Sequence, residues 1–125
     1  SQTPTIERAL LVTGFPYDRK TAKENNFAQF VTLKRRAQGI RRLGSAALDL
    51  SLVAAGSLDG YWEMKLKPWD IAAGLLIATE AGAVTSSWHG QPVDLFHGEV
   101  LCANPSLHRE LLSVLSTFQH GAIPV

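Results

Sequence analysis

Cysteine is almost missing from this chain of 125 residues, since Cys102 is the only one. A single cysteine excludes an internal disulfide framework. No apolar run reaches the roughly 20 residues that a helix needs to cross a bilayer, and the first residues lack the charged and apolar regions of a secretory signal. We therefore expect no membrane partner and a protein of the reducing cytoplasm, with Cys102 as a small residue of a buried strand.

An excess of one charge is also missing, because 12 Lys and Arg residues stand beside 11 Asp and Glu residues. A net charge of +1 gives no strong field for nucleic acid, so we interpret the basic residues at 34–36 and 41–42 as a solvated helix end and loop. The acids are too dispersed for the dense carboxylate cluster that a two-metal site requires. The histidines show no metal-ligand spacing and are expected on the surface or in turns; they are His89, His97, His108 and His120.

What is present is an alternation of strand and helix patterns over a length that suits one domain, residues 1–125. Short apolar runs predict strands, and apolar residues at helical spacing predict helices. Their alternation predicts an α/β layered sandwich, a sheet flanked by helices, with Trp62, Trp69 and Phe96 in its core. The predicted strands are 9–13, 40–43, 58–66, 83–86 and 99–103, and the predicted helices are 21–36, 46–55, 71–81 and 106–118.

The most informative stretch is 67–82. Pro68 favours an extended residue before it, and Asp70 is a favoured helix N-cap. The residues from Ile71 to Ala81 are apolar on nearly every side, which predicts a buried helix that stops at Gly82. A carboxylate at the positive end of such a helix either caps it or serves a metal ion or substrate beyond that end. The residues alone favour capping.

Two further positions raise the same question. Gly44, Ser45 and Ala46 open a helix, where Ser45 is a suitable cap and free amides are able to face a substrate oxygen or phosphate. Glu63 lies near the end of a predicted strand, seven residues before Asp70. The position of Glu63 suits a solvated edge residue as well as a functional one.

The pattern Trp-Asp-x-Ala-Ala-Gly at 69–74, followed by apolar residues and Glu-Ala-Gly at 80–82, resembles the C-terminal signature of the inositol monophosphatase family. The segments 11–19, 40–50, 59–63 and 102–105 are also similar to family segments, so the resemblance runs from about residue 9 to about residue 115. The family's Gly-Glu-Glu segment and Asp-Pro-x-Asp-Gly-Thr loop, which carry most of its metal ligands, do not occur in this sequence. The chain thus resembles the C-terminal half of the family's fold, a mixed sheet flanked by helices.

The resemblance implies a Mg²⁺-dependent phosphomonoesterase that hydrolyses inositol monophosphate, or a related sugar or polyol phosphate, through a metal-activated water. It implies that Asp70 is a metal ligand and that Glu63 accepts hydrogen bonds from substrate hydroxyls. The turn of Gly44, Ser45 and Ala46 would lie beside the substrate. The resemblance assigns no catalytic residue to this chain, because water activation and most phosphate contacts belong to the other half.

Four residues around these positions have open roles. Lys65 stands where many family members carry glycine, a difference that could alter substrate preference. Arg41 suits a buried structural ion pair or an approach to the site. Tyr17 and Asp18 belong to a loop that the resemblance brings near the active site, although an ordinary surface turn explains them equally well.

We expect the isolated chain to be inactive. We expect it to need the missing N-terminal half as a partner, and to form a homo-oligomer once complete. A rival hypothesis is a catalytically inactive domain of the same family, kept for polyol binding or for assembly.

Overall fold

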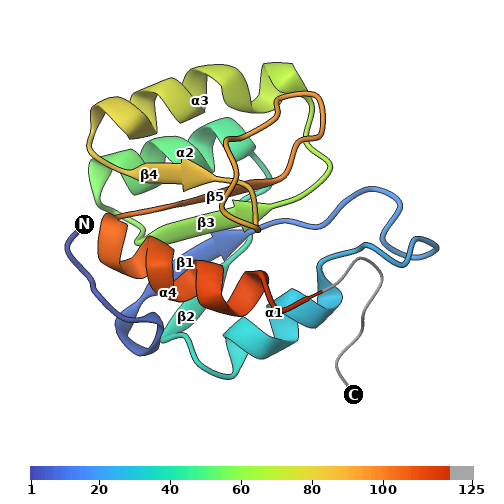
Figure 1. Cartoon of the computed structure of the whole chain (residues 1–125), viewed down its shortest axis with the longest axis horizontal. Coiled ribbons are helices and arrows are strands. Elements are labelled where there is room, and N and C mark those ends of the chain that lie inside the picture. The colour runs from blue at the N-terminus through green and yellow to red at the C-terminus, as the bar shows by residue number, and fades with distance from the viewer. Residues whose placement is uncertain (119–125) are drawn as a thin grey trace.

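The computed structural model describes residues 1–118, in which five strands form one mixed sheet with the order β2-β1-β3-β5-β4 (Figure 1). The central strand β3 (Gly60–Glu63) is parallel to β1 (Leu10–Thr13) and antiparallel to β5 (Val100–Ala103). β2 (Gly39–Arg41) extends the sheet in parallel beside β1, and β4 (Val84–Ser86) closes the other edge antiparallel to β5. The predicted α/β layered fold with a mixed sheet is confirmed.

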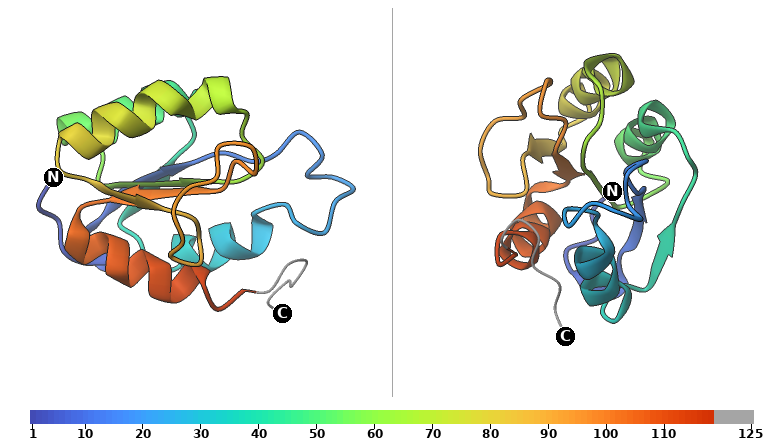
Figure 2. Two further views of the ribbon diagram at one scale, coloured as in Figure 1. Left: turned by 45° about the horizontal axis from the view of Figure 1, so that its top comes forward. Right: turned by 90° about the vertical axis from the view of Figure 1, so that its right-hand side faces the viewer.

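Helices cover both faces of this sheet (Figure 2). α2 (Ala46–Ala55) and α3 (Pro68–Glu80) pack against each other on one face. α1 (Phe27–Lys34) and α4 (Pro105–Leu115) lie on the other face, where the short 3₁₀ helix η1 (Ile6–Arg8) also contacts α4. None of the helices within residues 1–118 is both long and apolar enough to cross a membrane.

Strand residues alternate between two apolar cores, one on each face of the sheet. Leu11 and Trp62 belong to the core beneath α1 and α4, whereas Val12 and Tyr61 belong to the core beneath α2 and α3. This alternation follows from the two-residue period of a strand. Cys102 is fully buried in β5, as expected, and burial raises the pKa of its thiol to about 12.

The predicted helix 21–36 is too long, because α1 begins only at Phe27. The residues before it form turns in which the amides of Arg19 and Ala22 bond to the carbonyls of Pro16 and Asp18. Asn26 then adopts a left-handed φ of 71°, which a continuous right-handed helix does not allow. The other predicted elements exist, and their ends differ from the predicted ones by a few residues; the predicted strand 58–66, for example, pairs only over 60–63.

The prediction that helix 71–81 is buried all round is wrong. Only Ile71, Gly74 and Ala78 of α3 are buried, and a Cβ on Gly74 would lie 2.7 Å from Cδ1 of Leu50, so α2 packs tightly on this narrow stripe. The opposite side of α3 is apolar and exposed. Trp69 is part of it at 80% exposure, so its assignment to the core is wrong.

Two other residues lie elsewhere than the sequence predicts, and a third lies beyond the described part of the chain. Phe96, expected in the core, is 89% exposed in the loop before β5. His108, expected on the surface, is buried on α4, with Nε2 2.7 Å from Oγ of Ser86. His108 was misjudged because the helix 105–115 presents it to β4 rather than to solvent. His120 lies outside the described residues.

Candidate functional site

The candidate site lies where the carboxyl ends of β1 and β3 meet the amino ends of α2 and α3, toward the right of Figure 1. Both helices run back along the sheet from this edge, so their positive dipole ends face it. Ligands of open α/β sheets commonly bind beyond the carboxyl ends of parallel strands. This edge also carries most of the residues singled out from the sequence.

Glu63 is the last residue of β3 and the centre of this group. Its Oε1 accepts a 2.7 Å hydrogen bond from the hydroxyl of Tyr61. A Cβ on Gly14 would lie 2.6 Å from Oε2 of Glu63, so any residue other than glycine would push the carboxylate out of its present position. Burial and the charge of Asp70 raise the pKa of Glu63, while the Tyr61 hydrogen bond and the Arg42 charge oppose the rise. A half-buried carboxylate with a fixed orientation is thus available at the sheet edge.

Asp49 is an acid that the sequence analysis did not single out. It lies on the first turns of α2, is 1% exposed, and its Oδ1 is the one buried side-chain oxygen or nitrogen within residues 1–118 without a hydrogen-bond partner. Burial, together with the nearby Glu63 charge, raises the pKa of Asp49 to about 7. The only sequence signal was an acidic residue among apolar ones in a helix, which does not reveal which side the carboxyl takes.

Asp70 is the third residue of α3 and not its N-cap, because the helix begins with Pro68 and Lys67 takes the cap position. Proline is well suited to the first turn, where no amide hydrogen bond is lost. Asp70 still satisfies the helix start, since its Oδ2 accepts a 3.0 Å hydrogen bond from the Lys67 amide. Its other carboxylate oxygen makes no hydrogen bond with residues 1–118 and is available to a further partner.

The turn before α2 caps that helix as predicted. The Leu48 amide donates a 3.2 Å hydrogen bond to Oγ of Ser45. Gly44 and Ser45 are exposed and Ala46 is half-buried, so the first turn of α2 is open at the same edge as Glu63. Arg41 is exposed, which removes the interpretation of a buried ion pair for it.

The loop after β1 also reaches this edge. Tyr17 is fully exposed on it, and Asp18 forms a 2.9 Å ion pair with Nζ of Lys65. Lys65 has a φ of 59°, a left-handed conformation that favours glycine. The lysine therefore occupies a backbone position natural for glycine and links the turn after β3 to the loop after β1.

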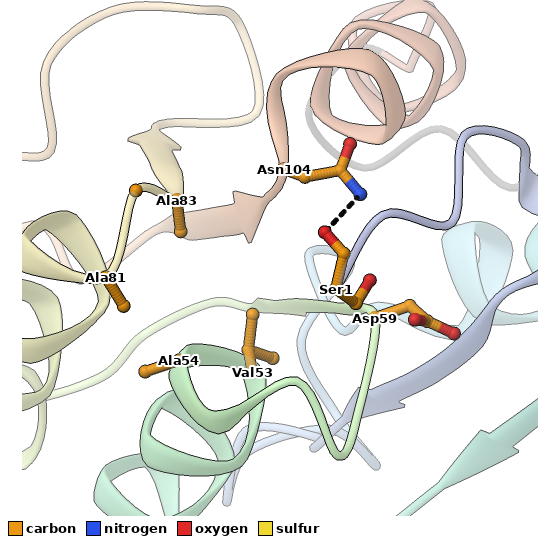
Figure 3. Close-up of a pocket in the computed structure, with 8 residues that line it drawn as sticks. Ser1, Val53, Ala54, Asp59, Ala81, Ala83 and Asn104 are labelled. Carbon is orange, nitrogen blue, oxygen red and sulfur yellow. Dashed lines mark hydrogen bonds between the residues drawn. The ribbon is translucent and has the colours of Figure 1, made fainter.

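No cluster of three or more His, Cys, Asp or Glu side chains in residues 1–118 is arranged to hold a metal ion. Asp70 is therefore an isolated candidate ligand. A small hollow elsewhere lies between the end of α3 and the start of β3, lined among others by Asp59, Ala81 and Asn104 (Figure 3). Because it is at the opposite end of α3 from Asp70, it does not belong to this site.

Comparison with known proteins assigns this layered α/β fold to a family. The sequence model of the inositol monophosphatase family matches residues 1–120. Inositol-1-monophosphatase from Synechocystis is 47% identical over 116 residues, which are 93% of this chain and 40% of that protein. A putative Nus factor SuhB from Neisseria meningitidis is 39% identical, over 89% of this chain and 42% of that protein.

A solved structure gives the same result for the fold. The inositol monophosphatase from Anabaena (Nostoc) superimposes with a TM-score of 0.91 at 42% identity, over 96% of this chain and 48% of that one. The chain belongs to the inositol monophosphatase family. It spans less than half the length of these relatives.

Proposed function

We propose that this chain is the C-terminal half of a phosphomonoesterase that hydrolyses inositol monophosphate or a related polyol phosphate. The observation that carries the proposal is the Glu63 carboxylate, held by Tyr61 and Gly14 at the carboxyl end of β3. In this proposal Glu63 binds the alcohol part of the substrate. The first turn of α2, with Gly44, Ser45 and Ala46, lies beside it.

Glu63 suits a polyol because a carboxylate accepts hydrogen bonds at both oxygens. Its Oε1 already accepts the Tyr61 hydroxyl, which leaves further lone pairs for substrate hydroxyls. Arg42 lies near enough to favour the ionised form of Glu63. The site therefore orients the alcohol by hydrogen bonds to a fixed acceptor.

The oxygen ligands that residues 1–118 offer fit a magnesium site only in part. Mg²⁺ binds oxygen ligands and usually needs more than one carboxylate or phosphate. Asp70 offers one suitable oxygen, and residues 1–118 provide no cluster that completes a site. We propose that Asp70 is one Mg²⁺ ligand and that the others come from the part of the relatives that this chain does not match. Bound Mg²⁺ would activate water and stabilise the leaving oxygen.

The apolar side chains exposed on α2 and α3 support the proposal that another part of the protein packs on these helices. Leu76 and Ile77 are 62% and 49% exposed on α3, and Leu48 is exposed on α2. Trp69 continues the same apolar face to the start of α3. Exposed apolar side chains that gather on one side of a soluble protein commonly mark an interaction site. We propose that the N-terminal half of the protein packs here, and that the complete protein is a cytoplasmic homo-oligomer.

The name of the Neisseria relative supports a second candidate function. That protein is named a putative Nus factor and not a phosphatase. The alternative is therefore a catalytically inactive domain of the same family, kept for polyol binding or for assembly. It predicts retained polyol binding without phosphate release.

A substrate comparison tests the role of Glu63. The part of the Synechocystis relative that this chain does not match, called the complementing segment below, is produced together with this chain. We expect Glu63→Gln to lower kcat/KM for inositol monophosphate about tenfold, from the loss of about 1–3 kcal/mol of charge-assisted hydrogen bonding. Hydrolysis of p-nitrophenyl phosphate, which lacks hydroxyls, should change little. Glu80→Gln, at an exposed position of α3, is the matched control. An equal loss on both esters, or a loss of Mg²⁺ affinity, contradicts the assignment.

A further inference from the structure

Asn26 has an unusual combination of burial and backbone conformation. It is fully buried and has a φ of 71°, directly before the first residue of α1. Residues other than glycine adopt this left-handed conformation infrequently, and asparagine is among the few that do. A fully buried amide side chain also needs hydrogen bonds at both ends. The surroundings of Asn26 supply them.

The Asn26 side chain joins the ends of two neighbouring strands. Its Nδ2 donates to the Gly14 carbonyl at 2.8 Å and to Oγ1 of Thr13 at 3.0 Å. Its Oδ1 accepts a 2.7 Å hydrogen bond from Nε1 of Trp62. Thr13 and Trp62 are paired in the β1–β3 register. The Asn26 amide therefore links the ends of β1 and β3, in addition to the direct hydrogen bond from Oγ1 of Thr13 to the Trp62 carbonyl.

Two of the three residues that Asn26 bonds adjoin Glu63. Trp62 precedes it in β3, and Gly14 lies directly against its carboxylate. A shift of Gly14 away from β3 would open space beside Oε2 and free the carboxylate to turn. The orientation of Glu63 therefore depends on Tyr61 from one side and on the Gly14 backbone from the other.

We propose that Asn26 is a positioning residue for Glu63, and that it acts through the Gly14 carbonyl and the Trp62 indole. This proposal rests on the proposed role of Glu63 in binding the alcohol part of the substrate. Asn26 does not touch the substrate. It holds the Gly14 backbone in contact with the Glu63 carboxylate, and this contact keeps the carboxylate in one orientation.

The neighbouring Asn25 provides a matched control. Its side chain is also buried, but Nδ2 donates to the Ala22 carbonyl and Oδ1 accepts the Phe27 amide. These bonds stay within the loop and the first turn of α1. Asn→Asp at either position replaces an amide donor by an oxygen with almost no change in shape. Only the change at Asn26 removes the bond to Gly14.

The first experiment uses the chain alone and follows the side-chain carboxyl carbon of Glu63 by NMR. Asn26→Asp should shift this resonance and its pH titration, and Asn25→Asp should leave both unchanged. If Asn26→Asp does not fold, Asn26→Gly keeps the left-handed backbone and removes the same bonds. An unchanged Glu63 resonance in the folded Asn26 variants, or equal shifts in the Asn25 variant, overturns the proposal.

The second experiment measures kinetics with the complementing segment. Asn26→Asp should raise KM for inositol monophosphate about fivefold to tenfold, the equivalent of about one net hydrogen bond, with kcat and the KM for p-nitrophenyl phosphate nearly unchanged. A fall in kcat on both esters instead indicates a general structural role and overturns the proposal. If the assembled wild type releases no phosphate, the proposed function fails, and the NMR experiment still decides the role of Asn26.

Discussion

The hydroxyl of Tyr61 donates a 2.7 Å hydrogen bond to Oε1 of Glu63, two residues further along β3. Residues two apart on a strand share one face, so the bond forms without any distortion of the strand. Burial, reinforced by the charge of Glu63, raises the pKa of Tyr61, which keeps the phenol a donor at all ordinary pH values. The pair thus presents an oriented carboxylate at the sheet edge.

Removal of the phenol hydroxyl tests this pairing. Tyr61→Phe should cost about 1–3 kcal/mol of folding free energy, because Glu63 loses a donor while it stays largely buried. The pKa of Glu63 should rise further, since the Tyr61 bond lowers it. Urea unfolding and a carboxyl NMR titration measure the two effects. Tyr17→Phe, at a fully exposed position, should change neither. Equal stability of the Tyr61 variant and the wild type would show that the hydrogen bond is unimportant.

Asp49 should make the stability of the chain depend on pH. Its pKa is about 7, above the usual value of 3.8. For an acid with a raised pKa in the folded state, the stabilisation is complete below the unfolded pKa and is lost as pH rises through the folded pKa. The loss therefore falls between about pH 4 and about pH 7 and amounts to about 4 kcal/mol, because each pKa unit is worth about 1.4 kcal/mol.

The Asp49→Asn variant tests this pH dependence directly. An amide does not ionise, so the slope of unfolding free energy against pH in this window should become much smaller in the variant. Part of the slope should remain, because the pKa of Glu63 is also raised. Asp94→Asn, at an exposed loop position, should keep the slope of the wild type. Urea unfolding across the window gives both slopes. The account of Asp49 is wrong if its variant keeps the full pH dependence.

The apolar outer face of α3 should determine both the self-association of the chain and its binding to the complementing segment. Changing both Leu76 and Ile77 to Gln should leave the fold intact, because both side chains are largely exposed. It should reduce self-association of the chain and weaken binding to the complementing segment. Sizing chromatography and a binding titration provide the measurements. Val31→Gln, on the exposed side of α1 across the sheet, should affect neither. Unchanged association of the double variant would exclude this face as the interface.

Local patterns predicted most of the fold. Ser45 marks the start of α2 because its cap preference is strong, and it takes the expected cap position. The apolar residues of α3 were harder to interpret. Composition reveals that the helix is apolar. It does not distinguish a helix buried in the core from a helix whose exposed apolar face is an interface.

The site was predicted less completely. Glu63, Asp70 and the turn at Ser45 were found through a family resemblance, and they do share one edge of the sheet. Asp49 and Asn26 were missed because their roles depend on contacts between distant segments, such as the bond from Trp62 to Asn26. Neither residue belongs to a recognisable local pattern.

The central claim is that this chain completes a Mg²⁺-dependent phosphatase and contributes Asp70 to it. The most direct measurement is phosphate release from inositol monophosphate by the chain, by the complementing segment, and by both together. Only the combination should be active, and a chelator should abolish its activity. Asp70→Asn should lower turnover by at least about a hundredfold with the fold unchanged, because the amide oxygen of Asn is still able to accept the hydrogen bond from the Lys67 amide but binds Mg²⁺ poorly. Robust turnover by the 125 residues alone, or full activity of the Asp70 variant, would contradict the account.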